Sequence, residues 1–509
     1  MAIPSMFIAW ERALAKSLAE LASTLGLAAQ PSWAGVDVTG ICEDSRRLVP
    51  GDLFVAISGK DQDGSSHVAR AVDCGAVAVL AERELRATVP VLVVPLARVA
   101  LAQLAAAFYG HPTRDLFTVG VTGTNGKTTV CHWTADVLGR NQTTIVSTVR
   151  NPSLGLPGLT TPPSPVIQSV ARNAADAGAQ NLILEASSAG IDQERVSAVD
   201  FDACVFTNLS LEHVRHHNGL AAYRNAKLRL FATLKPEAWA IVNANDSMIE
   251  VLAAATSAHV MRYGWDCWAD IRASNIHLEP RSSQFTVTVG KDQEMDVHLS
   301  LPGSHNISNA LAAISVGVAA GLPIQVICDR LTQARPIPGR CEFVSHADGR
   351  VAVIDFAHNG ASLEALLSSL KPNVRRLIVV FGCPGDGERE KRLSMGAASV
   401  RWADEIILTS DNPKREEPRS ILEEIREGMA DSSICVNSVL DRAKAIGIAV
   451  GLAAPGDLVV VAGKGHETEQ LVQGERLPYS DAETLRDLGF LPDTGFAGLG
   501  HVQASFADD

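Results

Sequence analysis

The stretch that decides the fold is "FTVGVTGTNGKTTVCHWTADVLG", residues 117–139. It reads as an apolar strand, a loop containing Gly120, Gly123 and Gly126, and a helix that opens at Lys127. Glycines let backbone N–H groups turn toward an anion, and a helix N-terminus adds partial positive charge, so this order of elements predicts a phosphate-binding loop. The usual spacing G-x-x-x-x-G-K-[ST] would need a glycine at position 121, where Val121 stands. The loop is therefore a variant of that motif.

The residue types of the loop suit a nucleotide triphosphate. Lys127 would reach the β- and γ-phosphates, and the hydroxyl of Thr128 would lie on Mg²⁺. The alternative is a glycine-rich turn with a surface lysine, which the dense pattern between a strand and a helix disfavours. The remaining loop residues expected to contact ATP are Gly123, Thr124, Asn125, Gly126 and Thr129.

Strands and helices alternate outward from this loop in both directions. "NLILEAS" and "ACVFTNLS" follow it, and after "RPIPGRCEF" the alternation restarts with "VAVIDFA", "RLIVVFG", "DEIILTS" and "DLVVVAG". Such alternation is typical of parallel, doubly wound sheets. We predict an α/β protein with a small α/β N-terminal domain (1–110) and a central P-loop parallel-sheet ATPase domain (111–338). A C-terminal Rossmann-like domain (339–490) and a loose tail (491–509) follow.

Composition narrows the class of protein. The 509 residues carry a net charge of −13, which argues against general nucleic-acid binding. Nine scattered cysteines fit reduced thiols, no apolar run is long enough to span a membrane, and the N-terminus lacks the pattern of a signal peptide. We expect a soluble cytoplasmic monomer without membrane insertion or nucleic-acid partners.

The loop "GTNGKTT" is similar to the nucleotide loop of the Mur ligase family, which includes folylpolyglutamate synthetase, and the resemblance extends over nearly the whole chain. Within the family, the chain looks most like the ligases that add the third residue of the peptidoglycan stem. The resemblance implies that ATP phosphorylates the D-glutamate carboxylate of UDP-N-acetylmuramoyl-L-alanyl-D-glutamate. The amine of a free amino acid, diaminopimelate or lysine, would then attack the acyl phosphate.

The resemblance also implies roles for residues outside the loop. Catalysis would rest on Lys127, Glu185, His217, Lys227 and Arg340, with Mg²⁺ held by Thr128, Glu185, His217 and Lys227, the last as a CO₂-derived carbamate. Tyr223 and Phe231 complete the Y-x-x-x-K-x-x-x-F pattern around that lysine. The residues implied for the UDP-linked substrate are Ser45, Arg46, Thr160, Thr161, Ser187, Gln193 and Arg195.

Further matches lie toward the C-terminus. Asn306, Asn309, Arg340 and Asp355 match positions that contact ATP, and His358 follows closely. Lys391 and Arg392 form a basic pair suited to phosphate or carboxylate. The pocket for the incoming amino acid would contain Asp411, Asn412, Lys414, Gly463 and Glu467.

The chain departs from the family pattern at several positions. Diaminopimelate-adding members usually carry D-N-P-R, but here Lys414 ends "DNPK", and Gly387 follows "PGD" where an arginine usually follows "GGD". A lysine offers a point charge where arginine offers a two-pronged fork. The other departures are Ala189, Glu212, Arg215 and Asn218.

These departures leave two alternatives open. One is a related ligase that adds a different amino acid to a related carboxylate in another pathway. The other is a regulatory protein with a relic nucleotide site, which the joint presence of Lys127, Thr128, Glu185, His217 and Lys227 opposes.

Overall fold

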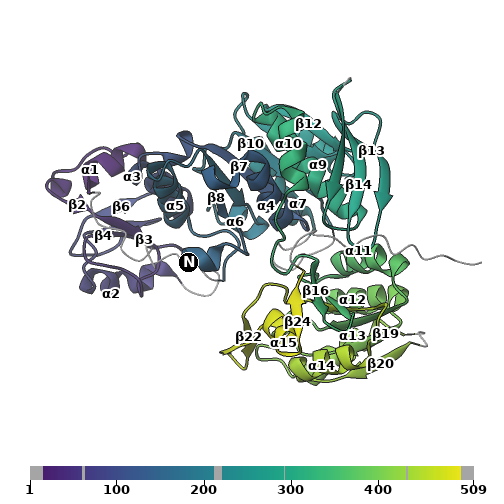
Figure 1. Cartoon of the computed structure of the whole chain (residues 1–509). Coiled ribbons are helices and arrows are strands. Elements are labelled where there is room, and N and C mark those ends of the chain that lie inside the picture. Colours follow the sequence, from purple (N-terminus) through teal and green to yellow (C-terminus); the bar gives the residue numbers. More distant parts are fainter. Residues whose placement is uncertain are drawn as a thin grey trace, which may run out of the picture. The chain divides into compact units, whose positions relative to one another are not determined.

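The computed structural model describes residues 15–59, 63–156, 158–210, 220–291, 293–430 and 434–493. The chain divides into two compact units (Figure 1). The first comprises residues 1–277, 284–299 and 305–335, and the second comprises residues 278–283, 300–304 and 336–509. Each unit is described by itself.

The first unit begins with a small three-layer α/β fold. Four parallel strands lie in the order β3 (Gly40–Cys42), β4 (Asp52–Val55), β5 (Ala78–Ala81) and β6 (Val91–Val93). Alternate residues of β4 point to opposite faces, as the pleat requires. Leu53 and Val55 pack with α1 (Leu18–Thr24) and α3 (Ala97–Phe108), whereas Phe54 packs with α2 (Val68–Asp73). A short antiparallel pair, β1 (Lys16–Ser17) with β2 (Asp37–Val38), adjoins it.

The same unit contains a nine-stranded sheet, in the order β15-β14-β13-β12-β11-β10-β7-β9-β8. Its pairs from β8 through β13 are parallel. The strands span β7 Phe117–Thr122, β8 Thr143–Val146, β9 Asn181–Glu185, β10 Ala203–Phe206, β11 Trp239–Asn243, β12 His259–Gly264, β13 Ile271–Leu278, β14 Ser283–Val289 and β15 Gln293–Leu299.

Helices cover the middle of this sheet because its strands β7, β9, β10 and β11 are buried along almost their whole length. They span α4 Lys127–Leu138, α5 Ser164–Asp176, α6 Ser188–Asp192, α7 Leu220–Ala232, α8 Ile249–Ala255, α9 Ser304–Ala319 and α10 Ile324–Thr332. Helices α5, α7 and α8 share one hydrophobic core with β9 and β10. Close packing of α9 against α4 and α10 depends on Gly317, where a Cβ would lie 2.7 Å from Val137 and 2.8 Å from Ile327.

The second unit is a seven-stranded sheet in the order β20-β19-β18-β21-β17-β16-β24. Its strands span β16 Glu342–His346, β17 Val351–Asp355, β18 Arg376–Phe381, β19 Glu405–Leu408, β20 Cys435–Ser438, β21 Asp457–Ala462 and β24 Phe490–Pro492. All of these pairs are parallel except those that β16 makes with β17 and β24. A separate antiparallel pair joins β22 (Glu469–Val472) to β23 (Glu475–Pro478).

Two helical layers enclose the second sheet. Helices α11 (Gly360–Leu370), α12 (Arg389–Trp402) and α13 (Pro418–Glu427) cover one face. Helices α14 (Arg442–Leu452) and α15 (Asp481–Asp487) cover the other.

The predicted α/β class is confirmed, and every strand predicted from "NLILEAS" through "DLVVVAG" is present in a parallel sheet. The expected loose tail differs at its start, because Leu491 and Pro492 belong to β24 and pair with Ser345 and Val344. Residues 494–509 lie outside the described ranges. None of the described helices is both long enough and apolar enough to cross a membrane.

Candidate active site

The predicted nucleotide loop joins the carboxyl end of β7 to the first turn of α4, and two glycines decide its shape. Gly123 has φ +147° and Gly126 has φ +85°, conformations that residues with a Cβ rarely adopt. A Cβ on Gly123 would lie 1.8 Å from Oγ1 of Thr207, and one on Gly126 would lie 2.3 Å from Oδ1 of Asn309. Both glycines are therefore required by neighbouring side chains as well as by the turn.

The segment that follows β10 holds the loop in place. The backbone N–H of Thr124 donates to the carbonyl of Asn208 (2.8 Å), and that of Asn125 donates to Oδ1 of Asn208 (3.0 Å). Oγ1 of Thr207 donates to the carbonyl of Asn125 at 2.6 Å. These bonds fix the loop from outside, which preorganises its backbone for a ligand.

The remaining residues predicted to contact ATP in this unit lie around the same loop. Nζ of Lys127 donates to the carbonyls of Gly123 (3.1 Å) and Thr124 (2.8 Å). Thr128 and Thr129 are buried in the first turn of α4, while Asn306 and Asn309 are buried in α9, 3.3 Å apart between Oδ1 and Nδ2. The structure thus brings the loop and the two asparagines together.

Glu185 ends β9 directly beside the loop, because it pairs in parallel register with Val121 of β7. Its side chain is buried, and Oε2 accepts a hydrogen bond from Thr148 at 2.8 Å. Its other oxygen, Oε1, is buried without a hydrogen-bond partner among the described residues. A buried carboxylate oxygen in that state is well suited to a cation.

Helix α7 places the predicted carbamylated lysine on its inner face. Tyr223, Lys227 and Phe231 are spaced by four residues and are all buried. Nζ of Lys227 lies 4.5 Å from the ring centroid of Tyr223, whose hydroxyl is 3.0 Å from Oγ1 of Thr124 in the loop. The predicted ligand His217 lies outside the described residues. Within the described ranges, no cluster of three or more His, Cys, Asp or Glu could hold a metal.

Five of the seven residues predicted to contact the UDP-linked substrate form one hydrogen-bonded network next to Glu185. Oγ1 of Thr161 donates to the carbonyl of Glu185 (2.7 Å) and lies 2.9 Å from Oγ of Ser187. Arg195 donates through Nη1 to the carbonyl of Thr161 and through Nη2 to Oε1 of Gln193, both at 2.6 Å. Thr160 joins the network through Oγ1 of Thr148, 3.1 Å from its own Oγ1.

The two substrate residues predicted in the first small sheet differ in exposure. Ser45 is buried, whereas the guanidinium of Arg46 is exposed and forms a two-pronged ion pair with Asp44 (2.9 and 2.8 Å). This arginine lowers the pKa of Asp44 to about 2. Burial raises the pKa of neighbouring Glu43, and the positive charge of Arg195 partly offsets that rise. The predicted substrate residues of both sheets therefore border one charged region.

In the second unit, Arg340 and Asp355 lie together at the carboxyl end of β17. The guanidinium carbon of Arg340 lies 4.6 Å from the ring centroid of Phe356. The carboxylate of Asp355 accepts the backbone N–H groups of Cys341 and Ala357, both at 2.6 Å. Burial raises the pKa of Asp355, while Arg340 and these bonds lower it.

The predicted amino-acid pocket is centred on a residue that the sequence patterns did not single out. Lys464 is fully buried, and its Nζ donates to Oδ1 of Asn412 (3.0 Å) and to Oε2 of Glu467 (2.7 Å). Nδ2 of Asn412 donates to the same Glu467 oxygen at 2.9 Å. A Cβ on Gly463 would lie 2.8 Å from Oδ2 of buried Asp411. A lysine between two glycines was the available signal, but its burial needs the fold.

Lys414 and Arg392, two of the basic residues singled out in the sequence, differ in burial and in partners. Lys414 has φ +56° and forms an isolated parallel bridge with Val472 of β22, so its backbone is fixed while its side chain remains partly exposed. Arg392 is buried in ion pairs with Glu416 (2.6 Å) and Glu424 (2.9 Å). These carboxylates already neutralise Arg392, which therefore does not form a free basic pair with its neighbour.

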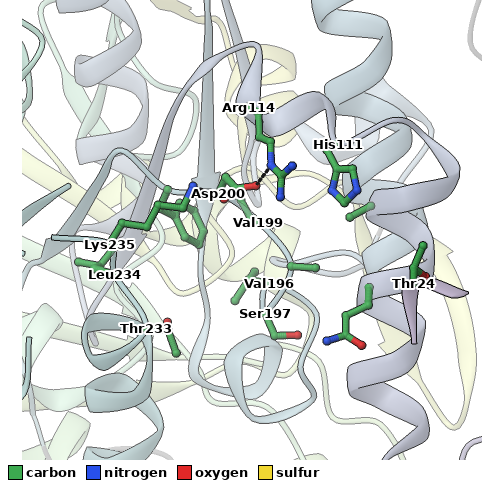
Figure 2. A pocket seen from close by; sticks show the side chains of 14 residues that line it. Thr24, His111, Arg114, Val196, Ser197, Val199, Asp200, Thr233, Leu234 and Lys235 are labelled. Carbon is green, nitrogen blue, oxygen red and sulfur yellow. Dashed lines mark hydrogen bonds and ion pairs between the residues drawn. The ribbon is translucent and has the colours of Figure 1, made fainter. Parts of the chain in front are cut away.

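A separate pocket of about 340 Å³ lies near the amino ends of β7 and β10, the sheet edge opposite to the nucleotide loop (Figure 2). Arg114 and Lys235 both form ion pairs with Asp200 in its wall, the first at 2.9 Å. In open parallel sheets ligands bind at the carboxyl ends of the strands, so we place the active site at the loop.

Comparisons with known proteins agree with this geometry. The Mur ligase family, catalytic domain, matches residues 37–109, the Mur ligase middle domain residues 121–317, and the Mur ligase, glutamate ligase domain residues 339–465. The UDP-N-acetylmuramoyl-L-alanyl-D-glutamate–2,6-diaminopimelate ligase of Streptomyces coelicolor is 39% identical over 94% of this chain and 97% of its own. Its Bacillus licheniformis counterpart is 35% identical over 90% and 96%. A solved structure of a ligase of the same name matches with a TM-score of 0.65 and 29% identity over 92% and 98%. The chain belongs to the Mur ligase family.

Proposed function

We propose that the chain is an ATP-dependent ligase that adds the third amino acid to UDP-N-acetylmuramoyl-L-alanyl-D-glutamate in peptidoglycan synthesis. The observation that carries this proposal is the position of Glu185. It pairs with Val121 at the root of the nucleotide loop and accepts a hydrogen bond from Thr161 of the substrate network. The nucleotide and the carboxylate substrate would thus meet at the carboxyl ends of the strands.

The chain's own residues supply charge and position for the reaction. In the proposed mechanism, Lys127 and the loop N–H groups bind the β- and γ-phosphates of ATP, and Arg195 and Thr161 orient the UDP-linked dipeptide. Arg340 would contact the transferred phosphate. Because two anions must approach each other in phosphoryl transfer, positive charge and fixed geometry account for most of the catalysis.

The described residues fit a divalent cation and a carbamate. The unpartnered Oε1 of Glu185 and the buried hydroxyl of Thr128 are the oxygens that would hold Mg²⁺, with His217 as a further ligand. Burying an ammonium is costly, so the fully buried Lys227 is a candidate for conversion to an anionic carbamate. When bound, Mg²⁺ neutralises phosphate charge.

The second unit would select the amino acid. Asp411, Asn412, Gly463 and Glu467 gather at the carboxyl ends of β19 and β21 and would bind an amine, while Lys414 would meet the distal group of the substrate. The relatives are named for 2,6-diaminopimelate, which favours this amino acid over lysine. Lys414 itself favours the second candidate, a ligase that adds a different amino acid, because arginine usually stands there.

The proposal also includes the division into domains 1–110, 111–338 and 339–490. Because the proposed substrate is UDP-linked, we propose that the enzyme acts in the cytoplasm, as a monomer.

The test is ATP-dependent phosphate release with UDP-N-acetylmuramoyl-L-alanyl-D-glutamate and a panel of amino acids. We expect selective turnover with diaminopimelate or lysine. Turnover only with another acceptor would support the second candidate, and ATP binding without any turnover would refute both.

A further inference from the structure

We propose that Lys464 is a positioning residue that builds the amino-acid pocket by holding Asn412 and Glu467 in one fixed arrangement. This inference rests on the proposed function. Lys464 does not contact the reacting atoms in this scheme; it acts through the two side chains that it joins.

The backbone around Lys464 leaves its side chain little freedom. Gly463 and Gly465 flank it with φ +112° and φ +52°, and a Cβ on Gly465 would lie 2.8 Å from the carbonyl oxygen of Gly339. The backbone N–H of Gly463 donates to the carbonyl of Asp355 at 3.0 Å. The turn is therefore clamped between two other segments, and the lysine side chain points into the protein with no exposed surface.

The hydrogen bonds of Lys464 determine which way Asn412 faces. Oδ1 of Asn412 accepts from Nζ of Lys464 and from the backbone N–H of Leu471, both at 3.0 Å. Two donors on this side oblige the amide nitrogen to face the other way, where it donates to Oε2 of Glu467. A cation at Lys464 thus sets the orientation of the amide and, through it, of the carboxylate.

The same arrangement leaves acceptors for an amine. Both bonds to Glu467 end on its Oε2, so its Oε1 receives neither of them, and the carboxylate of Asp411 is buried close by. Two carboxylates and one ammonium leave one excess negative charge, which matches one ammonium group of the incoming amino acid. Burial raises the pKa of Asp411, and the charge of Lys464 is the largest influence that lowers it. Without Lys464, two nearby carboxylates would repel each other and only the backbone N–H of Leu471 would orient the amide of Asn412.

The test compares Lys464→Met with wild type in the phosphate-release assay. Lys464→Met keeps most of the length of the side chain and removes its charge. We expect the KM for the amino acid to rise about tenfold or more, the scale found when a buried supporting partner is removed. The KM values for ATP and for the UDP-linked dipeptide should stay within about twofold. The matched control is Lys444→Met, an exposed lysine of the same unit whose side chain is 77% exposed.

A double-mutant cycle with Glu467→Gln separates positioning from general loss of structure. If Lys464 acts through Glu467, then Lys464→Met in the Glu467→Gln background should raise the KM for the amino acid far less than in wild type. If Lys464→Met does not fold, Lys464→Gln serves instead, because it retains a hydrogen-bond donor without a charge.

The outcomes are distinct. If the wild type is active and the Lys464 variant has an unchanged KM for the amino acid, the positioning role is refuted and the proposed function is not. Equal increases in all three KM values, or additive effects in the cycle, would also refute it. An inactive wild type with every acceptor would refute the proposed function itself, and the positioning role with it.

Discussion

Gly123→Ala tests whether the nucleotide loop depends on the close approach of Thr207. A methyl group at Gly123 would lie 1.8 Å from Oγ1 of Thr207 and 3.1 Å from the backbone nitrogen of Asn208. The hydroxyl must move, and it then loses its bond of 2.6 Å to the carbonyl of Asn125. That carbonyl keeps only its bond from Nδ2 of Asn208 (3.1 Å), and the loop backbone shifts from the position that would bind phosphate.

The magnitude follows from two contributions. Losing one of the two hydrogen bonds to the carbonyl costs about 0.5–1.5 kcal/mol. The left-handed backbone adds about 1–3 kcal/mol for a residue with a Cβ. Gly178→Ala is the matched control, because Gly178 has φ +81° in the same unit but nothing within 4 Å of its would-be Cβ. The difference between the two variants isolates the clash, and it predicts that ATP binding weakens by roughly 2- to 12-fold more in Gly123→Ala.

The assay is titration calorimetry with ATP and Mg²⁺, with thermal melts of both variants. Equal ATP affinities in Gly123→Ala and Gly178→Ala would refute the reasoning, because the contact with Thr207 would then carry no cost. A lower melting temperature in Gly123→Ala with unchanged ATP affinity would equally refute the link between this contact and nucleotide binding.

Three further predictions concern ionisable side chains. Lys227→Ala should abolish turnover while calorimetry still detects ATP binding, and full turnover without added short carboxylates would contradict the carbamate. Arg442→Met breaks a fully buried ion pair with Asp481 (2.7 Å), so urea unfolding should show a loss of about 3–5 kcal/mol, against under about 0.5 kcal/mol for Lys444→Met. Burial lowers the pKa of His305 to about 4, below its unfolded value of about 6.5, so the folded state binds fewer protons between these values. The stability present above pH 6.5 should therefore fall as the pH drops toward 4. Thermal melts should show that the melting temperature of His305→Gln depends less on pH than that of wild type. Equal pH dependence in the two proteins would contradict this prediction.

Much of the fold could be predicted from local patterns. Apolar runs such as "NLILEAS" and "RLIVVFG" are buried on both faces, and strands of that kind form parallel sheets between helices. The short strands at the edges of the sheets could not be predicted in the same way. Strand β24 has three residues, and its pairing with β16 depends on a partner about 145 residues away in sequence.

In the candidate site, too, the residues that are neighbours in sequence could be predicted more readily than those that are brought together by the fold. The loop 123–129 could be predicted from the sequence, because the glycine spacing, the lysine and the start of the helix lie within one short stretch. The network of Thr161, Ser187 and Arg195 was assigned by resemblance, and the structure shows these residues in contact. Arg392 shows the limit of such reasoning, since only the fold reveals that Glu416 and Glu424 neutralise it.

The sequence by itself determined the α/β class and the phosphate loop, because both depend on residues that are neighbours along the chain. Only the tertiary structure decided what Lys464 does. Its partner Asn412 is 52 residues away, and a lysine becomes a buried, orienting charge only when β19 and β21 bring their following loops together. Burial removes water as the competing partner, so the same ammonium that would be an unremarkable surface charge fixes an amide and a carboxylate.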